Sequence, residues 1–468
     1  MTNDDLAFSD ATTLQKLMTA GSVSSVELTK LYLDRLEKYG HVYGAVVTIL
    51  HQRAMKEAKR ADRERKAGKI RSPLHGVPYG VKDLLATPDA PTTWGSAPYR
   101  DQHFDFDATV VKKISDAGGV LLAKLAMVEL AGGFGYSDAD ASFTGPGRTP
   151  WNAKFWSGGS SSGTGASVAA GLVGFGIGTE TSGSILNPAT ACGITGLRPT
   201  YGRVSRHGAM ALCWSLDKIG PMARSARDTE TILRVIAGAD PADPTAVDRP
   251  LRAPTRRPRV AVLKNATHGV MPEVKANFEA SLKVLAQFCD ITMDVELPDA
   301  PYGAAVGTIV SAEGAAAFRD LIESGKSRML QNTGDHLGGY ASYATLAVDY
   351  IDAQRQRPLM IKKVNDAFGT YDGVATPTLS TVTPPVGIPF NKAYPNVEGG
   401  PSLIGAGNAC GLPAIGMPNG FGENNLPTGI ALLGLAFGEA RLTTIAKRYQ
   451  AATDFHTRRP SLVTETPV

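Results

Sequence analysis

The chain has 468 residues, of which 43% are hydrophobic and 20% are charged, and this composition is ordinary for a globular protein with a large buried core. Its 48 Lys and Arg residues against 44 Asp and Glu residues leave a formal net charge of +4. That excess is too small for the electrostatic footprint of a nucleic-acid or anionic-membrane binding protein. Small-molecule chemistry is favoured.

Cysteine usage and the first residues indicate a reduced compartment. The four cysteines lie far apart, with no C-x-x-C pair and no His at a metal-ligand spacing: Cys192, Cys213, Cys289 and Cys410. The stretch MTNDDLAFSDATTL lacks the basic and then apolar segments of a secretory signal, and no apolar run reaches the roughly 18 residues that a transmembrane helix needs. We expect a cytoplasmic protein, monomeric or homodimeric, that binds neither membrane nor nucleic acid.

The first part of the chain carries helical patterns. Asp10, or the serine before it, can cap a first short helix, and Ser24, or the serine after it, can cap a second one that runs to Gly40. A third helix, highly charged and therefore solvated on one face, is expected at about 53–66. We predict a helical N-terminal segment of about residues 1–70.

Strand-like and helix-like segments alternate after this point. Strands are expected within 76–85, 119–125, 258–264, 291–297 and 429–435, and helices within 109–117, 273–288 and 438–452. The alternation predicts an α/β fold, in which a mixed central β-sheet is covered by helices on both faces. No repeat or linker divides the chain, so we expect one domain, 1–468, with the helical segment packed on an α/β core of residues 71–468.

One block of glycine and hydroxyl residues is unusual. The stretch 157–189 reads SGGSSSGTGASVAAGLVGFGIGTETSGSILNPA and places two Gly/Ser clusters on either side of an apolar run. Small residues let the backbone approach a ligand closely, and hydroxyls supply nucleophiles and proton carriers. A flexible linker is the alternative, but a linker does not enclose an Ala/Val/Leu segment at helical spacing followed by a strand-like run. The block predicts an active site.

The second cluster can supply a nucleophile and its oxyanion donors. Ser184 lies in TSGSIL, where the backbone N–H groups of Thr181, Ser182, Gly183 and Ser184 itself follow one another. A glycine directly before the serine lets the turn aim several of these groups at one oxygen. A turn or capping hydroxyl is the structural alternative for Ser184.

A base and a proton carrier come from elsewhere. Lys82 stands in the apolar run GVPYGVKDLL, and burial disfavours the charged form of a lysine, which makes it a base near neutral pH. Its alternatives are an ammonium that reaches the surface or a pair with Asp83. Ser160 belongs to the first cluster. There Gly159–Gly163 also fits the G-x-S-x-G nucleophile elbow, which would make Ser161 the nucleophile, but the preceding TPWNAKFW is no β-branched strand.

Together these motifs resemble the amidase signature family. The Gly/Ser block and HGVPYGVKDLL are similar to its serine and lysine motifs, and similarity extends over about residues 10–455 through GPGRTPWN, GITGLRPTYGRVSRHG, SLDKIGPMARSARD and NACGLPAIGMPNGFGENNLPTGIALLG. The resemblance implies the amidase signature fold, with Ser184 as nucleophile, Ser160 as the middle serine after a cis peptide bond, and Lys82 as base. It implies no metal and no organic cofactor.

The chain departs from the commonest family pattern at three positions. Glu180 stands where Asp is usual, Ser182 where Gly is usual and Leu186 where Arg is frequent. None of these changes removes a catalytic group of the family. Thr179 and Ser161 are candidates for supporting hydrogen bonds, with a purely structural role as the alternative.

The family resemblance implies hydrolysis of a C–N amide bond, with carbamates, as in a urethanase, and esters as related substrates. We expect a small apolar or aryl substrate, as for an aryl acylamidase, and place its pocket at Met127, Phe134, Tyr136 and Phe143, or in the segment 302–345; the aromatic residues serve equally well as core. Two alternatives stay open. In the first, the chain is a glutamine-hydrolysing subunit of a tRNA-dependent amidotransferase and needs a partner. In the second, it is a non-catalytic binding protein on the same fold.

Overall fold

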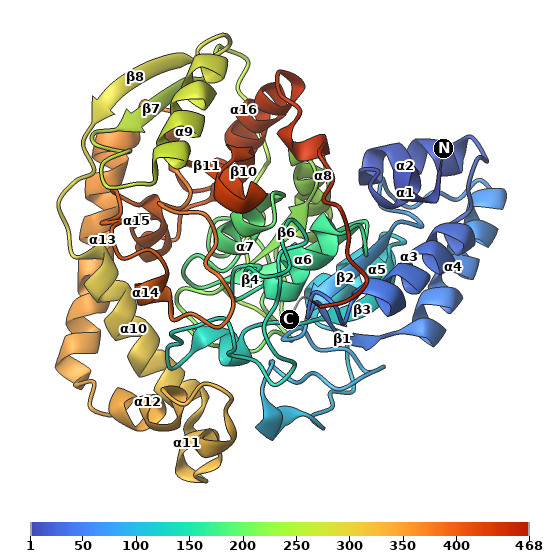
Figure 1. Ribbon diagram of the computed structural model, residues 1–468, viewed down its shortest axis with the longest axis horizontal. Helices are drawn as coiled ribbons and strands as arrows, with labels where there is room; N and C mark the ends of the chain where they lie inside the picture. The colour runs from blue at the N-terminus through green and yellow to red at the C-terminus, as the bar shows by residue number, and fades with distance from the viewer. Residues whose placement is uncertain (1, 467–468) are drawn as a thin grey trace.

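The computed structural model describes residues 2–466, in which eleven strands form one mixed sheet (Figure 1). In spatial order the strands are β1 (Val46–Ile49), β3 (Val120–Leu125), β2 (Pro78–Lys82), β4 (Phe175–Glu180), β6 (Lys218–Ala223), β5 (Thr195–Arg198), β10 (Ala414–Phe421), β11 (Pro427–Leu433), β9 (Gly373–Pro377), β7 (Arg259–Leu263) and β8 (Asp290–Val295). Strand β2 is parallel to β3 and β4, and β7 is parallel to β8 and β9. The other neighbours are antiparallel.

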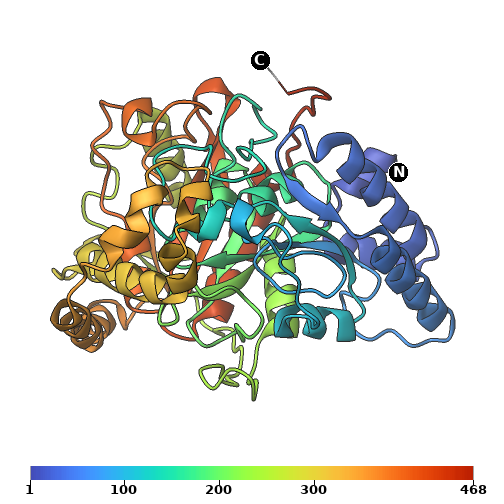
Figure 2. The same ribbon diagram turned by 90° about the horizontal axis from the view of Figure 1, so that it is seen from below.

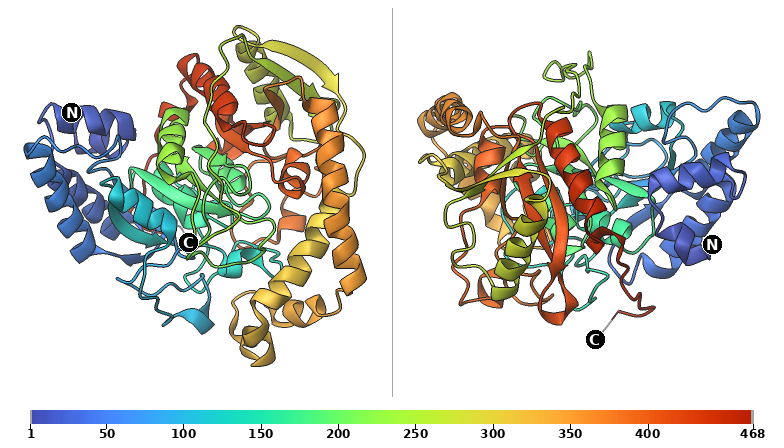
Figure 3. Two further views of the ribbon diagram at one scale, coloured as in Figure 1. Left: turned by 180° about the vertical axis from the view of Figure 1, so that it is seen from behind. Right: turned by 90° about the horizontal axis from the view of Figure 1, so that it is seen from above.

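Helices cover both faces of the sheet (Figure 2), so the predicted fold class is confirmed. They are α1 (Asn3–Ala7), α2 (Ala11–Thr19), α3 (Ser25–Tyr39), α4 (His51–Lys66), α5 (Thr109–Asp116), α6 (Ser162–Ala169), α7 (Leu186–Ala191), α8 (Ala226–Ile236), α9 (Pro272–Leu285), α10 (Tyr302–Ala317), α11 (Arg319–Glu323), α12 (Asp335–Ser342), α13 (Ala347–Phe368), α14 (Phe390–Ala393), α15 (Leu403–Ala409) and α16 (Glu439–Ala451). Helix α10 packs along α13 at one end of the molecule (Figure 3). Within residues 2–466, no helix has both the length and the apolarity to cross a membrane.

The N-terminal helices begin where their capping residues predict. The side chain of Asp10 accepts a hydrogen bond from the Thr13 amide at 2.7 Å, and Ser24 forms a reciprocal capping box with Glu27. The N-terminal segment of about residues 1–70, predicted to be helical, also contains one strand, since Val46–Ile49 forms β1 and pairs with β3. These four residues are too short a run to show a strand period beside two long helices.

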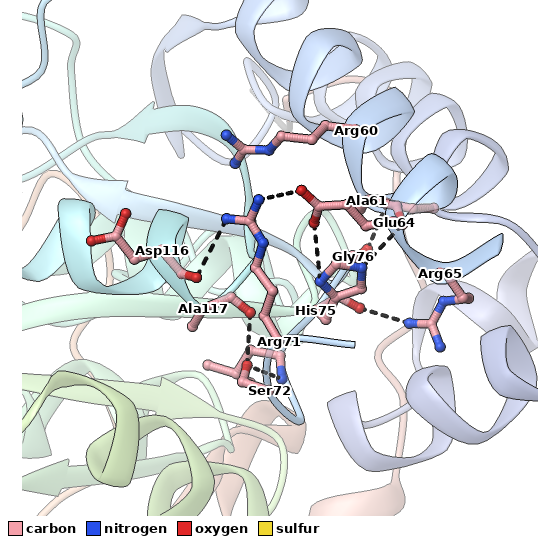
Figure 4. Close-up of polar contacts among 12 residues, drawn as sticks. Arg60, Ala61, Glu64, Arg65, Arg71, Ser72, His75, Gly76, Asp116 and Ala117 are labelled. Atoms are coloured by element: carbon pink, nitrogen blue, oxygen red, sulfur yellow. Dashed lines mark hydrogen bonds and ion pairs between the residues drawn. The ribbon is translucent and has the colours of Figure 1, made fainter. Parts of the chain in front are cut away.

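Polar contacts fix the approach of the chain to β2 (Figure 4). The buried imidazole of His75 lies with Nε2 3.0 Å from the carbonyl of Ala61 in α4, and Arg65 of the same helix donates to the His75 carbonyl at 2.9 Å. Burial lowers the pKa of His75. On the other side, Ser72 donates to the carbonyl of Ala117 behind α5 at 2.8 Å. Helix α4 and the end of α5 therefore hold the segment that leads into β2.

The parallel pairing of β2 and β4 brings two distant sequence motifs to one edge of the sheet. Val81 is paired with Ile177, so the carboxyl ends of both strands leave the sheet side by side. Gly176 permits the close packing of α6 on β4, since a Cβ atom there would lie 2.5 Å from the methyl group of Thr164. The two Gly/Ser clusters lie at the two ends of this α6–β4 unit.

A buried ion pair lies directly beyond β2. Lys124 in β3 and Asp83 are fully buried, with 3.1 Å between Nζ and Oδ1. The Asp83 carboxylate also accepts the Thr93 amide at 3.0 Å, and Lys124 donates to Thr92 Oγ1 at 2.6 Å. Asp83 is thereby committed to Lys124 and not to its sequence neighbour Lys82.

Removing one partner of this pair should destabilise the protein. Lys124→Met is expected to lower the free energy of unfolding by about 3–5 kcal/mol, because it leaves the buried Asp83 carboxylate without its cation. The double variant Asp83→Asn/Lys124→Met should recover most of this loss. Thermal unfolding followed by circular dichroism ranks the variants, and a double variant as unstable as Lys124→Met would contradict the assignment.

Candidate active site

Three polar side chains from separate segments meet at the end of β2. The Nζ atom of Lys82 lies 2.7 Å from Ser160 Oγ and 3.0 Å from Thr179 Oγ1 in β4. Lys82 and Ser160 are fully buried, and Thr179 is 7% exposed. The structure therefore joins the lysine motif to the first Gly/Ser cluster through two hydroxyl groups.

The backbone around Ser160 links the two Gly/Ser clusters. The peptide bond between Gly159 and Ser160 is cis. Ser160 accepts the Val128 amide through its carbonyl at 3.1 Å, and the amide of Ser161 donates to the carbonyl of Ser184 at 3.3 Å. In residues 2–466 no hydrogen bond joins the hydroxyls of Ser160 and Ser184. Both serines nonetheless belong to one connected site.

Ser161 has a supporting position. Its hydroxyl donates to the Thr179 carbonyl at 3.2 Å, and the Thr179 amide lies 3.3 Å from the same hydroxyl. The side chain is buried and bound to β4, so it is unavailable for attack on a substrate. This geometry disfavours the G-x-S-x-G interpretation.

The turn after β4 presents unused backbone donors. The amides of Ser182, Gly183 and Ser184 make no hydrogen bond to any described protein acceptor. Gly183 has a φ of +87°, a conformation that a residue with a Cβ atom adopts only with strain. Ser184 is 7% exposed and Ser182 is exposed, so the turn borders solvent. Three adjacent N–H groups of this turn are therefore left for an acceptor from outside the described protein.

The Glu180 carboxylate, to which the sequence assigned no role, binds the backbone directly after this turn. Glu180 Oε2 accepts the amides of Ile185 and Leu186 at 3.0 and 3.1 Å, at the start of α7. Its other oxygen accepts Arg198 at 2.7 Å and Asn408 at 2.9 Å. Burial alone would raise the pKa of Glu180, but the Arg198 ion pair and these hydrogen bonds lower it to about 2. The departure of Glu180 from the family pattern was the only sequence signal for this network.

A second carboxylate anchors the first residue of the turn. Thr181 donates through its hydroxyl to Asp217 Oδ1 at 2.6 Å, and the other oxygen of Asp217 accepts the amides of Leu212 and Cys213, each at 2.9 Å. Burial raises the pKa of Asp217 and lowers that of the neighbouring Lys218. Lys218 Nζ lies 3.5 Å from the Thr181 carbonyl. Both ends of the turn are therefore fixed by buried polar groups.

Lys82, like Lys218 beside the turn, changes its charge near neutrality in this geometry. Burial lowers its pKa to about 7, and the negative charges of Asp217 and Glu180 oppose that shift. Its polar contacts are hydroxyl groups, and no carboxylate of the described chain contacts it. A neutral amine at this position can accept a proton from Ser160.

Two cavities with separate sets of lining residues border the site. One, of about 240 Å³, reaches Thr179 and Thr181 and has apolar walls at Leu84, Met210 and Leu212. The other, of about 420 Å³, is bordered by Trp156 and by Asn187, which follows Ser184 by one turn. A substrate thus has room beside Thr181 and beside Asn187.

The residues predicted for the pocket lie in different environments. Met127 is fully buried in the main core, and Phe134 packs against Phe318 with 5.7 Å between ring centroids. Phe143 lies beside the Arg100 guanidinium. Tyr136 contacts the wall of the larger cavity through Trp156, with 6.0 Å between ring centroids. Tyr136 stands next to the serine cluster, since a Cβ atom on Gly159 would lie 3.1 Å from its hydroxyl oxygen.

The segment 302–345 forms α10, α11 and α12 at the end of the molecule occupied by α13. Residues from this segment do not line either of the two cavities. Within the described residues, no group of three His, Cys, Asp or Glu side chains is placed to hold a metal ion.

The mixed sheet with a lysine and two serine clusters at one edge defines the amidase class of hydrolases. The chain belongs to the Amidase family, whose model matches residues 27–443. It is 37% identical, over 98% of its own length and 99% of the relative's, to the glutamyl-tRNA(Gln) amidotransferase subunit of Roseiflexus sp. (strain RS-1).

Solved structures share the fold. The native peptide amidase of Stenotrophomonas maltophilia superposes with a TM-score of 0.84 at 31% identity, covering 97% of this chain and 98% of that one. The glutamyl-tRNA(Gln) amidotransferase subunit of Thermotoga maritima superposes with a TM-score of 0.74 at 28% identity, covering 91% of each chain. Both superpositions cover nearly the whole of this chain.

The pH dependence of activity should report the ionisation of Lys82. We expect kcat/KM to rise with pH through about 7, because only the neutral amine accepts a proton, and to fall about tenfold per pH unit on the acid side. Lys82→Arg should lower kcat/KM by at least about 10³-fold at every pH, since a guanidinium stays charged. A Lys82→Arg variant whose activity recovered at high pH would contradict this role.

Glu180 should affect turnover more than substrate binding. Glu180→Gln is expected to lower kcat by about 10–100-fold and to change KM less than about threefold, because an amide cannot accept from both α7 and Arg198. Glu180→Asp, which keeps the charge, should lose less. Steady-state kinetics measure both, with Glu296→Gln at an exposed ion pair as control. If Glu180→Gln instead raised KM by about 10–100-fold and left kcat unchanged, this positioning role would be excluded.

Proposed function

We propose that this chain hydrolyses an amide bond through an acyl-enzyme formed on Ser184. The observation that carries the proposal is the buried Lys82 amine, 2.7 Å from Ser160 Oγ, beside a turn with three free backbone amides. A base with a lowered pKa, a hydroxyl hydrogen-bonded to that base and a set of free amide donors are the parts that acyl transfer needs.

The proton path combines the contact between Lys82 and Ser160 with a transfer from Ser184 to Ser160 that the family resemblance implies. Neutral Lys82 accepts the proton of Ser160, which accepts that of Ser184 as the Ser184 oxygen attacks the substrate carbonyl. The tetrahedral oxyanion is held by the free amides of Ser182, Gly183 and Ser184. When the C–N bond breaks, Ser160 returns a proton to the leaving nitrogen, and Lys82 restores the Ser160 proton.

Hydrolysis of the ester intermediate uses the same groups. A water molecule attacks the acyl carbon while Ser160 takes its proton, with Lys82 as the final base. The Ser184 oxygen then leaves with a proton, and the free acid is released. Water supplies the hydroxyl of the acid, and the amine leaves with the proton from the first half-reaction.

The relatives favour glutamine as one candidate substrate. The sequence similarity to the Roseiflexus amidotransferase subunit reaches 37% identity over nearly the full length of both chains. On this proposal the chain releases ammonia from glutamine and works with partner subunits. Because that relative is one subunit of an amidotransferase, the isolated chain should then turn over slowly.

Other observations favour a small amide hydrolysed without a partner. The superposition is better on a peptide amidase than on the Thermotoga amidotransferase subunit, with TM-scores of 0.84 and 0.74. The larger cavity is lined mainly by apolar and aromatic residues and by no charged one. These features suit anilides, apolar primary amides and carbamates better than a charged amino acid.

A substrate panel with purified chain separates these proposals. Anilides, primary amides, carbamates and glutamine should be tested for product release, and Ser184→Ala should lower the rate on every substrate by at least about 10³-fold, because the acyl-enzyme cannot form. The exposed Ser22→Ala is the matched control. If glutamine were the one substrate of the panel to be hydrolysed, and if this required added partner subunits, the amidotransferase proposal would be favoured.

Active-site labelling tests whether the site is catalytic at all. A fluorophosphonate should modify wild-type chain and not Ser184→Ala, since labelling needs an activated serine. Full hydrolysis by Ser184→Ala would overturn the proposed nucleophile. Absence of both labelling and hydrolysis in folded wild-type protein would instead support a binding protein on the same fold.

A further inference from the structure

An aromatic cluster lies against the first Gly/Ser cluster. Trp156 stacks on Phe390 with 4.7 Å between ring centroids, and Tyr136 packs edge-on to both, at 6.0 and 5.8 Å. Phe390 comes from a segment more than 200 residues away in the sequence. The three rings form a small hydrophobic cluster separate from the main core.

The distant segment is fixed to the Trp156 backbone. The Trp156 amide donates to the carbonyl of Pro384 at 2.9 Å, and the hydroxyl of Thr383 donates to the Trp156 carbonyl at 2.7 Å. The amide of Phe390 donates to the carbonyl of Ser137 at 2.8 Å. The arrangement of these rings is therefore held by backbone hydrogen bonds at both ends.

Two rings of this cluster, those of Trp156 and Phe390, line the larger cavity, of about 420 Å³. Its remaining lining includes Tyr394, Pro395 and Thr381, and no lining residue carries a formal charge. The Tyr394 hydroxyl is already committed, since it donates to the carbonyl of Thr383 at 2.9 Å. The cavity therefore offers flat aromatic and aliphatic surface to an uncharged group.

This cavity lies next to the reacting groups. The side chain of Asn187, one of its lining residues, approaches Gly158 so closely that a Cβ atom there would lie 2.5 Å from Oδ1. A Cβ atom on Gly159 would lie 2.6 Å from Cζ2 of Trp156. Gly159 directly precedes Ser160, so the cavity adjoins the Ser160 side of the site.

The indole N–H of Trp156 has no partner in the described chain. Trp156 is 4% exposed, and its Nε1 atom is buried without a hydrogen bond. Cζ2 and Nε1 are bonded to the same ring carbon, so the unpaired N–H belongs to the indole edge that faces Gly159. A buried donor without an acceptor is costly. This donor points to a ligand atom that can accept it.

We propose that the cavity is the subsite for an uncharged aromatic ring on the leaving amine of the substrate, with a hydrogen-bond acceptor on the ring paired to Trp156 Nε1. The inference rests on the proposed function and names its substrate class as anilides with a polar ring substituent. Ser160 returns a proton to the leaving nitrogen, so substituents of that nitrogen lie beside Ser160 and Gly159. Rings in edge-to-face and stacked contact then hold the aryl group.

Three substrates separate the parts of this inference. They are 4-nitroacetanilide, whose leaving ring carries an acceptor, acetanilide, whose leaving ring carries none, and phenylacetamide, whose ring is on the acyl side. Trp156→Phe removes the N–H and keeps an aromatic ring. It should raise KM for 4-nitroacetanilide roughly tenfold, for acetanilide less than about threefold, and leave phenylacetamide within about twofold.

Two further variants keep the test decisive. Phe390→Leu should raise KM for both anilides by roughly tenfold and leave phenylacetamide unchanged, because it removes the ring contact but no donor. Trp151→Phe is the matched control, since the indole of Trp151 already donates to the carbonyl of Cys192 at 2.8 Å. Equal losses on all three substrates, or no effect of Trp156→Phe, would overturn the subsite.

A binding measurement distinguishes failure of the subsite from failure of the proposed chemistry. Calorimetry should show that 4-nitroaniline, the amine that 4-nitroacetanilide would release, binds Ser184→Ala and loses roughly tenfold in affinity when Trp156→Phe is added. Binding without any amide hydrolysis by wild type would support the subsite and refute the chemistry. Hydrolysis of anilides without Trp156-dependent binding would refute the subsite alone.

Discussion

The burial of the Lys82 amine is the constraint on which the rest of the site depends. A lysine taken out of water loses stability in its charged form, and its pKa falls to about 7. That shift survives only if no carboxylate pairs with the amine. The neighbouring acids are all bound elsewhere: Asp83 to Lys124, Glu180 to Arg198, and Asp217 to Thr181 and two backbone amides. The polar network around the site thus keeps negative charge near Lys82 but out of contact with it.

The contacts of Glu180 also explain how the turn after β4 keeps its conformation although Glu180 and Leu186 depart from the common family pattern. Glu180 is one methylene longer than the Asp that is common at this position, and its two oxygens span from the start of α7 to Arg198 and Asn408. Leu186 contributes its backbone amide to that carboxylate and its apolar side chain to the core. The pair of Glu180 and Arg198 therefore supplies an ion pair behind the turn without a charged side chain at position 186.

Local patterns in the sequence predicted the parts of the fold that local physics determines. Helix caps at Asp10 and Ser24 and the apolar runs of β2, β3, β7 and β11 lie where the pattern placed them. Strands β5, β6 and β10 were not predicted, because they are short or contain Gly and Pro, and because burial on both faces removes the alternation that marks a strand.

Long-range contacts limited what the sequence could say about the site. Motif order predicted Lys82, Ser160 and Ser184, which the sheet brings to one edge. The partners of Glu180 are separated from it by 18 and 228 residues, and no local pattern connects them. Tyr136 could be named as a pocket candidate, but its contacts with Trp156 and Phe390 depend on a loop fixed by backbone hydrogen bonds that carry no side-chain signature.

The two cavities differ in charge, and this difference bears on the choice of substrate. Free glutamine carries an ammonium and a carboxylate, which need partners when they leave water. The larger cavity has no charged lining residue. The smaller one is lined by Arg206, Asp217, Lys218 and Asp243. Arg206 already donates to Thr245 and the Trp214 carbonyl and lies 3.5 Å from Asp243, Asp217 accepts from Thr181, and Lys218 donates to the Leu216 carbonyl. Glutamine would have to displace these contacts, whereas an uncharged aryl amide would leave them intact.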